Sequence, residues 1–230
     1  MQLVRWLPKF LYKHKILDFI CKFGWQDCVI PVRYNSNART VIDLRDPEPR
    51  NVFIQKQFEP DFFDLANSFI GEKGTFFDLG ANVGFCSFGL VPTNPKTNFH
   101  LFEANPNLIP LLMQSVELHR YQCFHLNHCC ISDSNGKTNF QLEPNHTGQS
   151  HVSPIQSKGI EVPNLVLDDY CDQNQINCID FAKLDIEGNE LPALQGWQKN
   201  LSNHRVKAIY IEIIPENQER YGRKTNDPLA

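Results

Sequence analysis

A short segment of the chain, TFFDLGANVG at residues 75–84, places residues of distinctive chemistry at every second position: Asp78, Gly80, Asn82 and Gly84. The apolar residues before the turn are typical of a buried strand, and the FCSFGLV run that follows is compatible with a helix. Glycines at a strand-to-helix turn permit sharp bends and let main-chain amides approach a ligand closely. The segment therefore predicts a binding turn for a nucleotide-like cofactor.

The charge of Asp78 distinguishes between possible cofactors. A nicotinamide-binding turn has the pattern G-x-G-x-x-G and faces a pyrophosphate, which a carboxylate at this position would repel. S-adenosyl-L-methionine presents an ammonium and a sulfonium instead, and both favour a nearby carboxylate. Glu103 closes the next apolar run, FHLFE, where it is placed to accept hydrogen bonds from both ribose hydroxyls. We therefore expect S-adenosyl-L-methionine as the cofactor, and a nicotinamide dehydrogenase is the disfavoured alternative.

Lys183, Asp185 and Glu187 alternate along the segment KLDIEG, so in a continuing strand they project from one face. The two carboxylates lie at the carboxyl end of this strand, where open α/β sheets bind ligands. Asp185 or Glu187 is expected to act as a general base that removes the proton of an acceptor hydroxyl. Two alternatives stay open: both carboxylates bind a divalent cation, or Lys183 pairs with one of them and Glu187 caps the next helix.

His151, in the segment GQSHVSP, is another candidate for the base because an imidazole titrates near neutral pH. It lies within residues 132–164, which are rich in Ser, Asn, Gly, Pro and Gln. Such a polar stretch inside an α/β domain predicts a functional loop or hairpin beside the pocket. The alternative is an exposed histidine without a catalytic role.

Regular alternation of apolar runs and helix-compatible stretches begins at Thr75, which predicts βαβ units and a mainly parallel sheet. Further strands are expected at Phe124–Ile131, Ile179–Leu184 and Val206–Ile213. Prolines place the start of one intervening helix within residues 105–110. The predicted fold class is α/β, a doubly wound, Rossmann-like arrangement.

An N-terminal extension, residues 1–70, precedes the cofactor-binding domain expected at residues 71–230. Apolar residues at helical spacing predict an amphipathic helix over residues 2–22, which either docks on the core or contacts a membrane surface or a partner. The segment DPEPR is interpreted as turn-rich. A β-hairpin and a second helix are expected from three apolar runs: Cys28–Val32, Thr40–Leu44 and Phe58–Ile70.

The composition narrows the class of protein. The 230 residues carry 22 Lys and Arg against 26 Asp and Glu, which is not the basic footprint of a nucleic-acid-binding protein. Eight cysteines without a C-x-x-C pair favour a reduced, cytoplasmic protein, and no signal peptide or membrane-spanning stretch is expected. Adjacent Cys129 and Cys130 would point to opposite faces of a strand, so no metal site is predicted there with His125 or His128.

Several further segments resemble one family in order and spacing over roughly residues 40–220: FFDLGANVGFCS, HLFEANP, CCISDSNG, LDDYC and IDFAKLDIEGNELPALQGW. They are similar to the FkbM-type methyltransferases, a branch of the class I S-adenosylmethionine-dependent methyltransferases that methylates hydroxyl groups on varied natural products and sugars. The resemblance implies O-methylation of a saccharide or a small natural product by in-line methyl transfer. The expected partner is this acceptor and not nucleic acid, and the oligomeric state is left open.

Residue by residue, the resemblance implies that the cofactor lies against Asp78, Gly80, Asn82 and Gly84, and that its ribose lies on Glu103. It places the adenine near the segment Ile131, Ser132 and Asp133, and it makes Asp185 face the transferable methyl group. Similar proteins continue after ENQERYGR through another helix and a β-hairpin, so the sheet of this chain is expected to lack its C-terminal strands. The alternative function is therefore an inactive or fragmentary cofactor-binding module.

Overall fold

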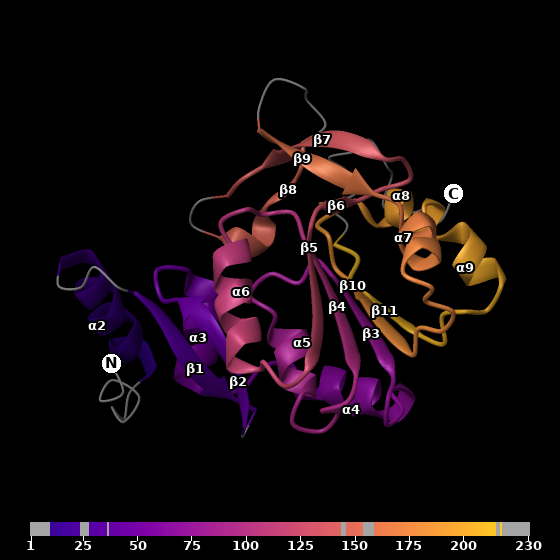
Figure 1. The fold of residues 1–230 in the computed structure, drawn as a ribbon. Coiled ribbons are helices and arrows are strands. Elements are labelled where there is room, and N and C mark those ends of the chain that lie inside the picture. Colours follow the sequence, from indigo (N-terminus) through magenta and orange to yellow (C-terminus); the bar gives the residue numbers. More distant parts are fainter. Residues whose placement is uncertain are drawn as a thin grey trace.

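The computed structural model describes residues 10–23, 28–35, 37–143, 146–153, 159–214 and 217. Five parallel strands form its central sheet in the order β11-β10-β3-β4-β5 (Figure 1). Their bounds are β3 Thr75–Leu79, β4 Asn98–Glu103, β5 Cys123–His128, β10 Phe181–Leu184 and β11 Ile209–Ile211. The chain runs outward from β3 through β4 to β5 and then crosses back to β10, so the strand order reverses at β3. This confirms the predicted doubly wound, Rossmann-like fold.

Successive side chains of the central strands enter two different cores, as the period of a strand requires. Phe76 belongs to the apolar cluster shared with three helices, α4 Pro60–Phe69, α5 Phe85–Leu90 and α6 Ile109–Leu118. Phe77 belongs to the cluster on the opposite face, where its ring stacks on Trp197 at 5.9 Å between centroids. That face is covered by α7 Leu167–Gln173, α8 Glu190–Gln195 and α9 Gln198–Ser202. Helices on both faces explain why apolar side chains predominate in the inner strands β3, β4 and β10.

The N-terminal extension contains α2 Phe10–Phe23, β1 Val29–Tyr34, β2 Ala38–Asp43 and α3 Pro47–Gln55 (Figure 1). The antiparallel pairing of β1 with β2 confirms the predicted hairpin. The predicted helix over residues 2–22 is present from Phe10 onward, and its first residues lie outside the described part of the chain. Leu17 is fully buried in the core that includes Phe76, so this helix docks on the core.

One expectation for the extension was wrong, because the DPEPR segment is helical. Asp46 caps α3 by accepting a hydrogen bond from the Glu48 main-chain nitrogen at 3.1 Å, and Pro47 occupies the first turn. Proline there has no main-chain N–H to leave unsatisfied, so a segment rich in turn formers starts a helix instead.

The hairpin supports the glycine-rich turn directly. The Thr40 hydroxyl donates to the Val83 carbonyl at 2.7 Å, and the Tyr34 hydroxyl donates to the Phe85 carbonyl at 2.6 Å.

Among the described helices, none has the length and apolarity needed to cross a bilayer.

A second sheet packs beyond the carboxyl ends of the central strands, at the top of Figure 1. Its strands are β6 Cys130–Ile131, β7 Gly136–Gln141, β8 His151–Val152 and β9 Ile160–Leu165, with the short turn η1 Thr147–Gln149 before β8. The strand predicted over Phe124–Ile131 is therefore two strands, because β5 pairs with β4 whereas β6 pairs with β9. The polar stretch 132–164 forms the expected hairpin through antiparallel β7 and β9.

The sheet is predicted to lack further strands after β11. Of the residues after β11, the structure describes residues 212–214 and Asn217, and Asn217 is buried. The remaining residues lie outside the described ranges, so the expected lack of further strands stays a prediction.

Candidate functional site

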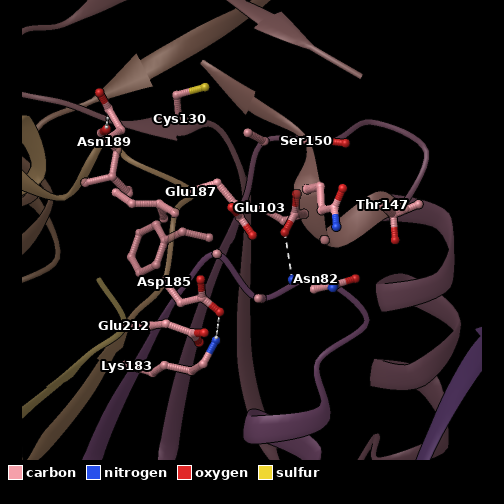
Figure 2. Close-up of a pocket in the computed structure, with 18 of the residues that line it drawn as sticks. Asn82, Glu103, Cys130, Thr147, Ser150, Lys183, Asp185, Glu187, Asn189 and Glu212 are labelled. Atoms are coloured by element: carbon pink, nitrogen blue, oxygen red, sulfur yellow. Dashed lines mark hydrogen bonds and ion pairs between the residues drawn. The ribbon is translucent and has the colours of Figure 1, made fainter. Parts of the chain in front are cut away.

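A cavity of about 450 Å³ opens at the carboxyl ends of β3, β4, β10 and β11 (Figure 2). The central sheet contributes Gly80, Glu103 and Asp185 to its lining. The second sheet contributes Ile131 and Val152, and the extension contributes further side chains from α3 and from the residues before α4. Its position outside the strand ends, where the strand order reverses, is the usual ligand site of open α/β sheets.

The turn after β3 follows a path that requires glycine. Gly80 has φ +83, and a Cβ there would lie 1.9 Å from the Asp185 carbonyl oxygen. Gly84 has φ +76 and precedes α5, where a Cβ would lie 2.3 Å from the Phe88 ring. Gly80 and Asn82 line the cavity, whereas Gly84 packs beneath the turn and does not.

Asp78 lies under the turn and not in the cavity. Its side chain is 1% exposed, and Oδ2 accepts hydrogen bonds from the Ser87 hydroxyl at 2.5 Å and the Ser87 main-chain nitrogen at 3.2 Å. Burial raises the pKa of this carboxyl despite the nearby Lys183. Ser87 in the first turn of α5 draws the carboxylate inward, so its expected contact with the cofactor stays a prediction.

Glu103 ends β4 and points into the cavity (Figure 2). Its Oε2 accepts from the Asn82 main-chain nitrogen at 2.7 Å, and its Oε1 accepts from the Asn105 main-chain nitrogen at 2.7 Å. Burial raises the pKa of Glu103 to about 7, although these main-chain donors favour the carboxylate. Each oxygen of a carboxylate has two acceptor positions, so further acceptor capacity remains for a ligand.

Lys183 and Asp185 form an ion pair at the wall of the cavity, with 2.6 Å between Nζ and Oδ2 (Figure 2). Burial opposes the charge on Lys183, but the neighbouring carboxyl groups of Asp185 and Asp78 favour the charge, and the pKa of Lys183 is raised. The expectation that Lys183 pairs with a carboxylate is confirmed.

Glu187 also lines the cavity, but it lies beyond the end of β10, with φ +56. Its Oε2 accepts a hydrogen bond from the Asn217 side chain. The alternative that Glu187 caps the next helix stays a prediction: the N-cap position of α8 is Asn189, and Glu190 accepts hydrogen bonds from the Ile186 and Gly188 main-chain nitrogens before it.

The remaining predicted residues, Ile131, Ser132, Asp133 and His151, lie in or beside the second sheet, and of these four only Ile131 lines the cavity. Ile131 lines the cavity, and its carbonyl accepts from the Asn189 side chain at 2.7 Å. Ser132 and Asp133 follow it outside the cavity lining. His151 lies in β8 between Ser150 and Val152, which both line the cavity while His151 does not. Alternation along the strand turns the imidazole away, so its role as a base stays a prediction.

Sequence reasoning missed three acidic side chains that line the cavity, Glu48, Glu59 and Glu212. Glu212 directly follows β11, as Asp185 directly follows β10, so an acid after an apolar strand was an available signal. Glu48 and Glu59 come from the extension, whose docking no sequence pattern revealed. Surrounding protein raises the pKa of all three, chiefly by desolvation, although each remains open to the solvent in the cavity.

The cavity is acidic. Its described lining contains six carboxylates and one ammonium: Glu48, Glu59, Glu103, Asp185, Glu187 and Glu212 with Lys183. Within the described ranges, no three His, Cys, Asp or Glu side chains are arranged to hold a metal ion.

Comparison with known proteins matches residues 78–226 to the model of the methyltransferase FkbM domain. A curated relative, the 2-O-methyltransferase NoeI of Sinorhizobium fredii (strain NBRC 101917 / NGR234), is 26% identical over 162 residues. That match covers 63% of this chain and 64% of NoeI, so the chain spans less than two thirds of the relative's length.

Two solved structures show partial similarity. The putative transferase PH0793 from Pyrococcus horikoshii has 15% identity and a TM-score of 0.35, over 52% of this chain and 48% of that chain. TYW2 from M. jannaschii, in complex with AdoMet, has 10% identity and a TM-score of 0.36, over 45% of this chain and 44% of that chain.

Proposed function

Because the chain belongs to the methyltransferase FkbM domain family, we propose that it transfers a methyl group from S-adenosyl-L-methionine to a hydroxyl group of a saccharide or small natural product. The observation that carries this proposal is Glu103, whose carboxylate is fixed in the cavity by two main-chain N–H groups. A carboxylate held in this way is positioned to accept hydrogen bonds from the two ribose hydroxyls.

The residues present fit this cofactor. Besides the acceptor capacity of Glu103, Asn82 has a buried side-chain oxygen without a hydrogen-bond partner among the described residues, which a ligand donor can satisfy. Ile131 lines the cavity, which supports the adenine position that the resemblance implies. When bound, the cofactor supplies a methyl group already activated by its sulfonium.

Asp185 is the better candidate for the general base. Its carboxylate lines the cavity and is oriented by Lys183 at 2.6 Å, whereas the Glu187 carboxylate is engaged by Asn217. In the proposed step, Asp185 accepts the proton of the acceptor hydroxyl as the hydroxyl oxygen bonds to the methyl carbon and the carbon–sulfur bond breaks. Positioning of the two reactants supplies the larger part of the catalysis.

The acidic lining of the cavity also favours some methyl acceptors over others according to their charge. Once Glu103 is occupied by ribose, five carboxylates and one ammonium remain along the cavity. Such a surface repels anions, and carboxylates are suitable acceptors for sugar hydroxyls. Neutral or cationic hydroxylated acceptors are therefore favoured over phosphorylated or carboxylated ones.

The alternative is a module that binds the cofactor without catalysis. The Lys183–Asp185 ion pair favours it, because the carboxylate proposed as the base is already engaged by an ammonium. Cofactor binding without methylation of any acceptor in a panel of saccharides and hydroxylated metabolites would support this alternative.

Titration calorimetry with S-adenosyl-L-methionine tests the proposed function. We expect binding by the parent chain and at least a tenfold weaker affinity for Glu103→Ala, since a carboxylate-assisted hydrogen bond contributes about 1.5–3 kcal/mol. Glu161→Ala is the matched control, because Glu161 pairs with Lys137 at the surface of the second sheet and does not line the cavity. A parent chain that releases no heat with the cofactor would contradict the proposal.

A further inference from the structure

Four residues of the second sheet's connecting segment, Thr147–Ser150, form one wall of the cavity and are called the strap below. We infer that Asp46, in the N-terminal extension, is a positioning residue that holds the strap over the bound cofactor. This inference rests on the proposed function, because it assigns to the extension a role in retaining the same cofactor.

Asp46 uses both carboxylate oxygens in two separate tasks. Oδ1 accepts from the Glu48 main-chain nitrogen and caps α3, as described above. Oδ2 accepts from the Thr147 main-chain nitrogen at 3.1 Å and from the Thr147 hydroxyl. The side chain is buried, at 8% exposure, so little water competes for these bonds. Asp46 thus joins the start of α3 to a turn that lies 101 residues later in the chain.

The other end of the strap is joined to the cofactor-binding residues. The Ser150 hydroxyl accepts from the Glu143 main-chain nitrogen at 3.1 Å and lies 3.5 Å from the Asn105 side-chain nitrogen. Asn105 in turn donates its main-chain N–H to Glu103. Figure 2 shows Thr147 and Ser150 on the side of the cavity where Glu103 and Asn82 lie. The strap is therefore held by Asp46 at one end and by the surroundings of Glu103 at the other.

Between these two ends, the hydrogen bonds of the strap within the described ranges are local: the Gln149 main-chain nitrogen donates to the His146 carbonyl, and the Gln149 carbonyl accepts from His151. The centre of the strap is the single 3₁₀ turn η1, which contains no buried residue. Gly148 passes so close to the extension and the cofactor turn that a Cβ would lie 2.6 Å from the Glu48 carboxylate and 3.1 Å from the Asn82 side-chain nitrogen. A short polar turn without an apolar anchor depends on its charge-assisted hydrogen bonds, so loss of Asp46 frees the strap.

The consequence concerns cofactor release. A ligand enclosed by a wall that must move before the ligand leaves has a residence time set by that movement. Weakening the Asp46–Thr147 contact is therefore expected to accelerate dissociation more than association.

The test uses variants that separate the two tasks of Asp46. Asp46→Ser preserves the helix cap, because serine is a good N-cap residue, but its side chain is too short to reach Thr147 as well. Thr147→Val removes the hydroxyl donor, and Thr147→Ser restores it. Matched controls are Asp43→Ser, at the end of β2, and Thr138→Val, in β7, since neither side chain lines the cavity.

Rapid-mixing measurement of S-adenosyl-L-methionine release is expected to show a rate about tenfold higher for Asp46→Ser, and a smaller increase for Thr147→Val. Thr147→Ser and both controls should match the parent chain. The double variant Asp46→Ser with Thr147→Val should release the cofactor no faster than Asp46→Ser alone, because the same contact is already lost. Amide hydrogen exchange at residues 147–152 should accelerate in Asp46→Ser.

Three results would overturn the inference or its premise, and they can be told apart. Release rates within twofold of the parent for both Asp46→Ser and Thr147→Val would overturn the role of Asp46 and leave the proposed function intact. Equal acceleration by Thr138→Val would assign the effect to general loosening of the second sheet and would also overturn it. A parent chain that does not bind S-adenosyl-L-methionine would contradict the proposed function and, with it, the cofactor role of the strap.

Discussion

At the scale of single residues, the chemistry of the cavity depends on how each carboxylate is surrounded. Asp78 and Glu103 both follow the pattern of an acid near the end of an apolar strand, yet one is drawn under the turn by Ser87 and the other is presented to the cavity by main-chain donors. Burial raises the pKa of both. The position of the nearest hydrogen-bond donors therefore decides which acid meets a ligand.

The pKa of Glu103 predicts a pH-dependent affinity for the cofactor. Burial raises this pKa to about 7, so lowering the pH through 7 protonates the carboxyl and removes an acceptor for the ribose hydroxyls. Affinity for S-adenosyl-L-methionine should be constant above pH 8 and should fall by up to about tenfold per pH unit below 7. Calorimetry from pH 5.5 to 9 measures this slope, and Glu103→Gln should abolish it. A slope of the same size in Glu103→Gln would assign the titration to another group.

The raised pKa of Glu103 affects the stability of the folded chain in the opposite direction to cofactor affinity. Because the folded-state pKa of Glu103 lies above the ordinary value of 4.5, ionisation opposes folding. Its contribution to stability is therefore present below pH 4.5 and is lost as the pH rises from 4.5 to about 7. Cofactor binding and the stability of the cofactor-free chain should thus change in opposite directions over the upper part of this range.

Substitution of the proposed base separates catalysis from binding. Asp185→Asn should lower kcat by about 10²–10⁴-fold, the usual contribution of a general base, while the affinity for S-adenosyl-L-methionine stays within twofold. Glu187→Gln should retain most of the parent's kcat, because that carboxylate is engaged by Asn217. Methyl-transfer rates with saturating cofactor compare the two variants. The reverse ranking would make Glu187 the base.

At the scale of elements, the turn after β3 passes directly against Asp185, the residue that follows β10. The Gly80 position leaves no room for a Cβ beside the Asp185 carbonyl, and the hairpin residues Thr40 and Tyr34 bind carbonyls of the following turn and helix. The glycine-rich turn is therefore fixed by three neighbours: β10, the N-terminal hairpin and α5.

Gly80→Ala tests this close approach. The variant must separate the turn from β10 and hold alanine at φ +83, so we expect a loss of roughly 2–4 kcal/mol in the free energy of unfolding, together with loss of cofactor binding. Gly71→Ala is the control, because a Cβ at Gly71 meets nothing within 4 Å. Chemical denaturation should place the control within about 0.5 kcal/mol of the parent. Equal stability of Gly80→Ala and Gly71→Ala would disprove the steric argument.

At the scale of the whole molecule, the extension and the central sheet share one apolar core. The cluster that contains Leu17 of α2 and Val41 of β2 also contains Phe76 and Phe181 of the sheet. Within α4, Phe62 contacts the rings of Phe63, Phe76, Phe181 and Tyr210. Such continuity predicts that the described extension and sheet unfold together.

Phe62→Ala tests this continuity. The Phe62 side chain is 2% exposed, so its truncation should cost about 3–5 kcal/mol in the free energy of unfolding. In a background with Trp6→Phe and Trp25→Phe, fluorescence of Trp197, on the opposite face of the sheet, and far-ultraviolet circular dichroism should report the same shifted midpoint. Two separate transitions, with only one of them moved, would show that the extension unfolds independently.

The sequence by itself determined the central architecture and three residues of the cavity lining. Apolar runs that alternate with helical patterns predicted the five parallel strands, because burial on both faces leaves a strong local signal. Gly80, Asn82 and Glu103 were likewise predictable, since a turn that needs glycine and an acid at a strand end depend on residues close together in the chain. The resemblance to the FkbM-type methyltransferases agrees with the family match.

Only the tertiary structure decided which side chains share the cavity. Glu48, Glu59 and Glu212 reach it from segments far apart in the chain, and Asp46 meets Thr147 across 101 residues. Conversely, Asp78 and His151 lie outside the lining, because Ser87 holds the first under the turn and strand alternation turns the second away. Local patterns determine the conformation of a segment, whereas contacts between distant segments depend on packing of the whole chain, which no single motif records.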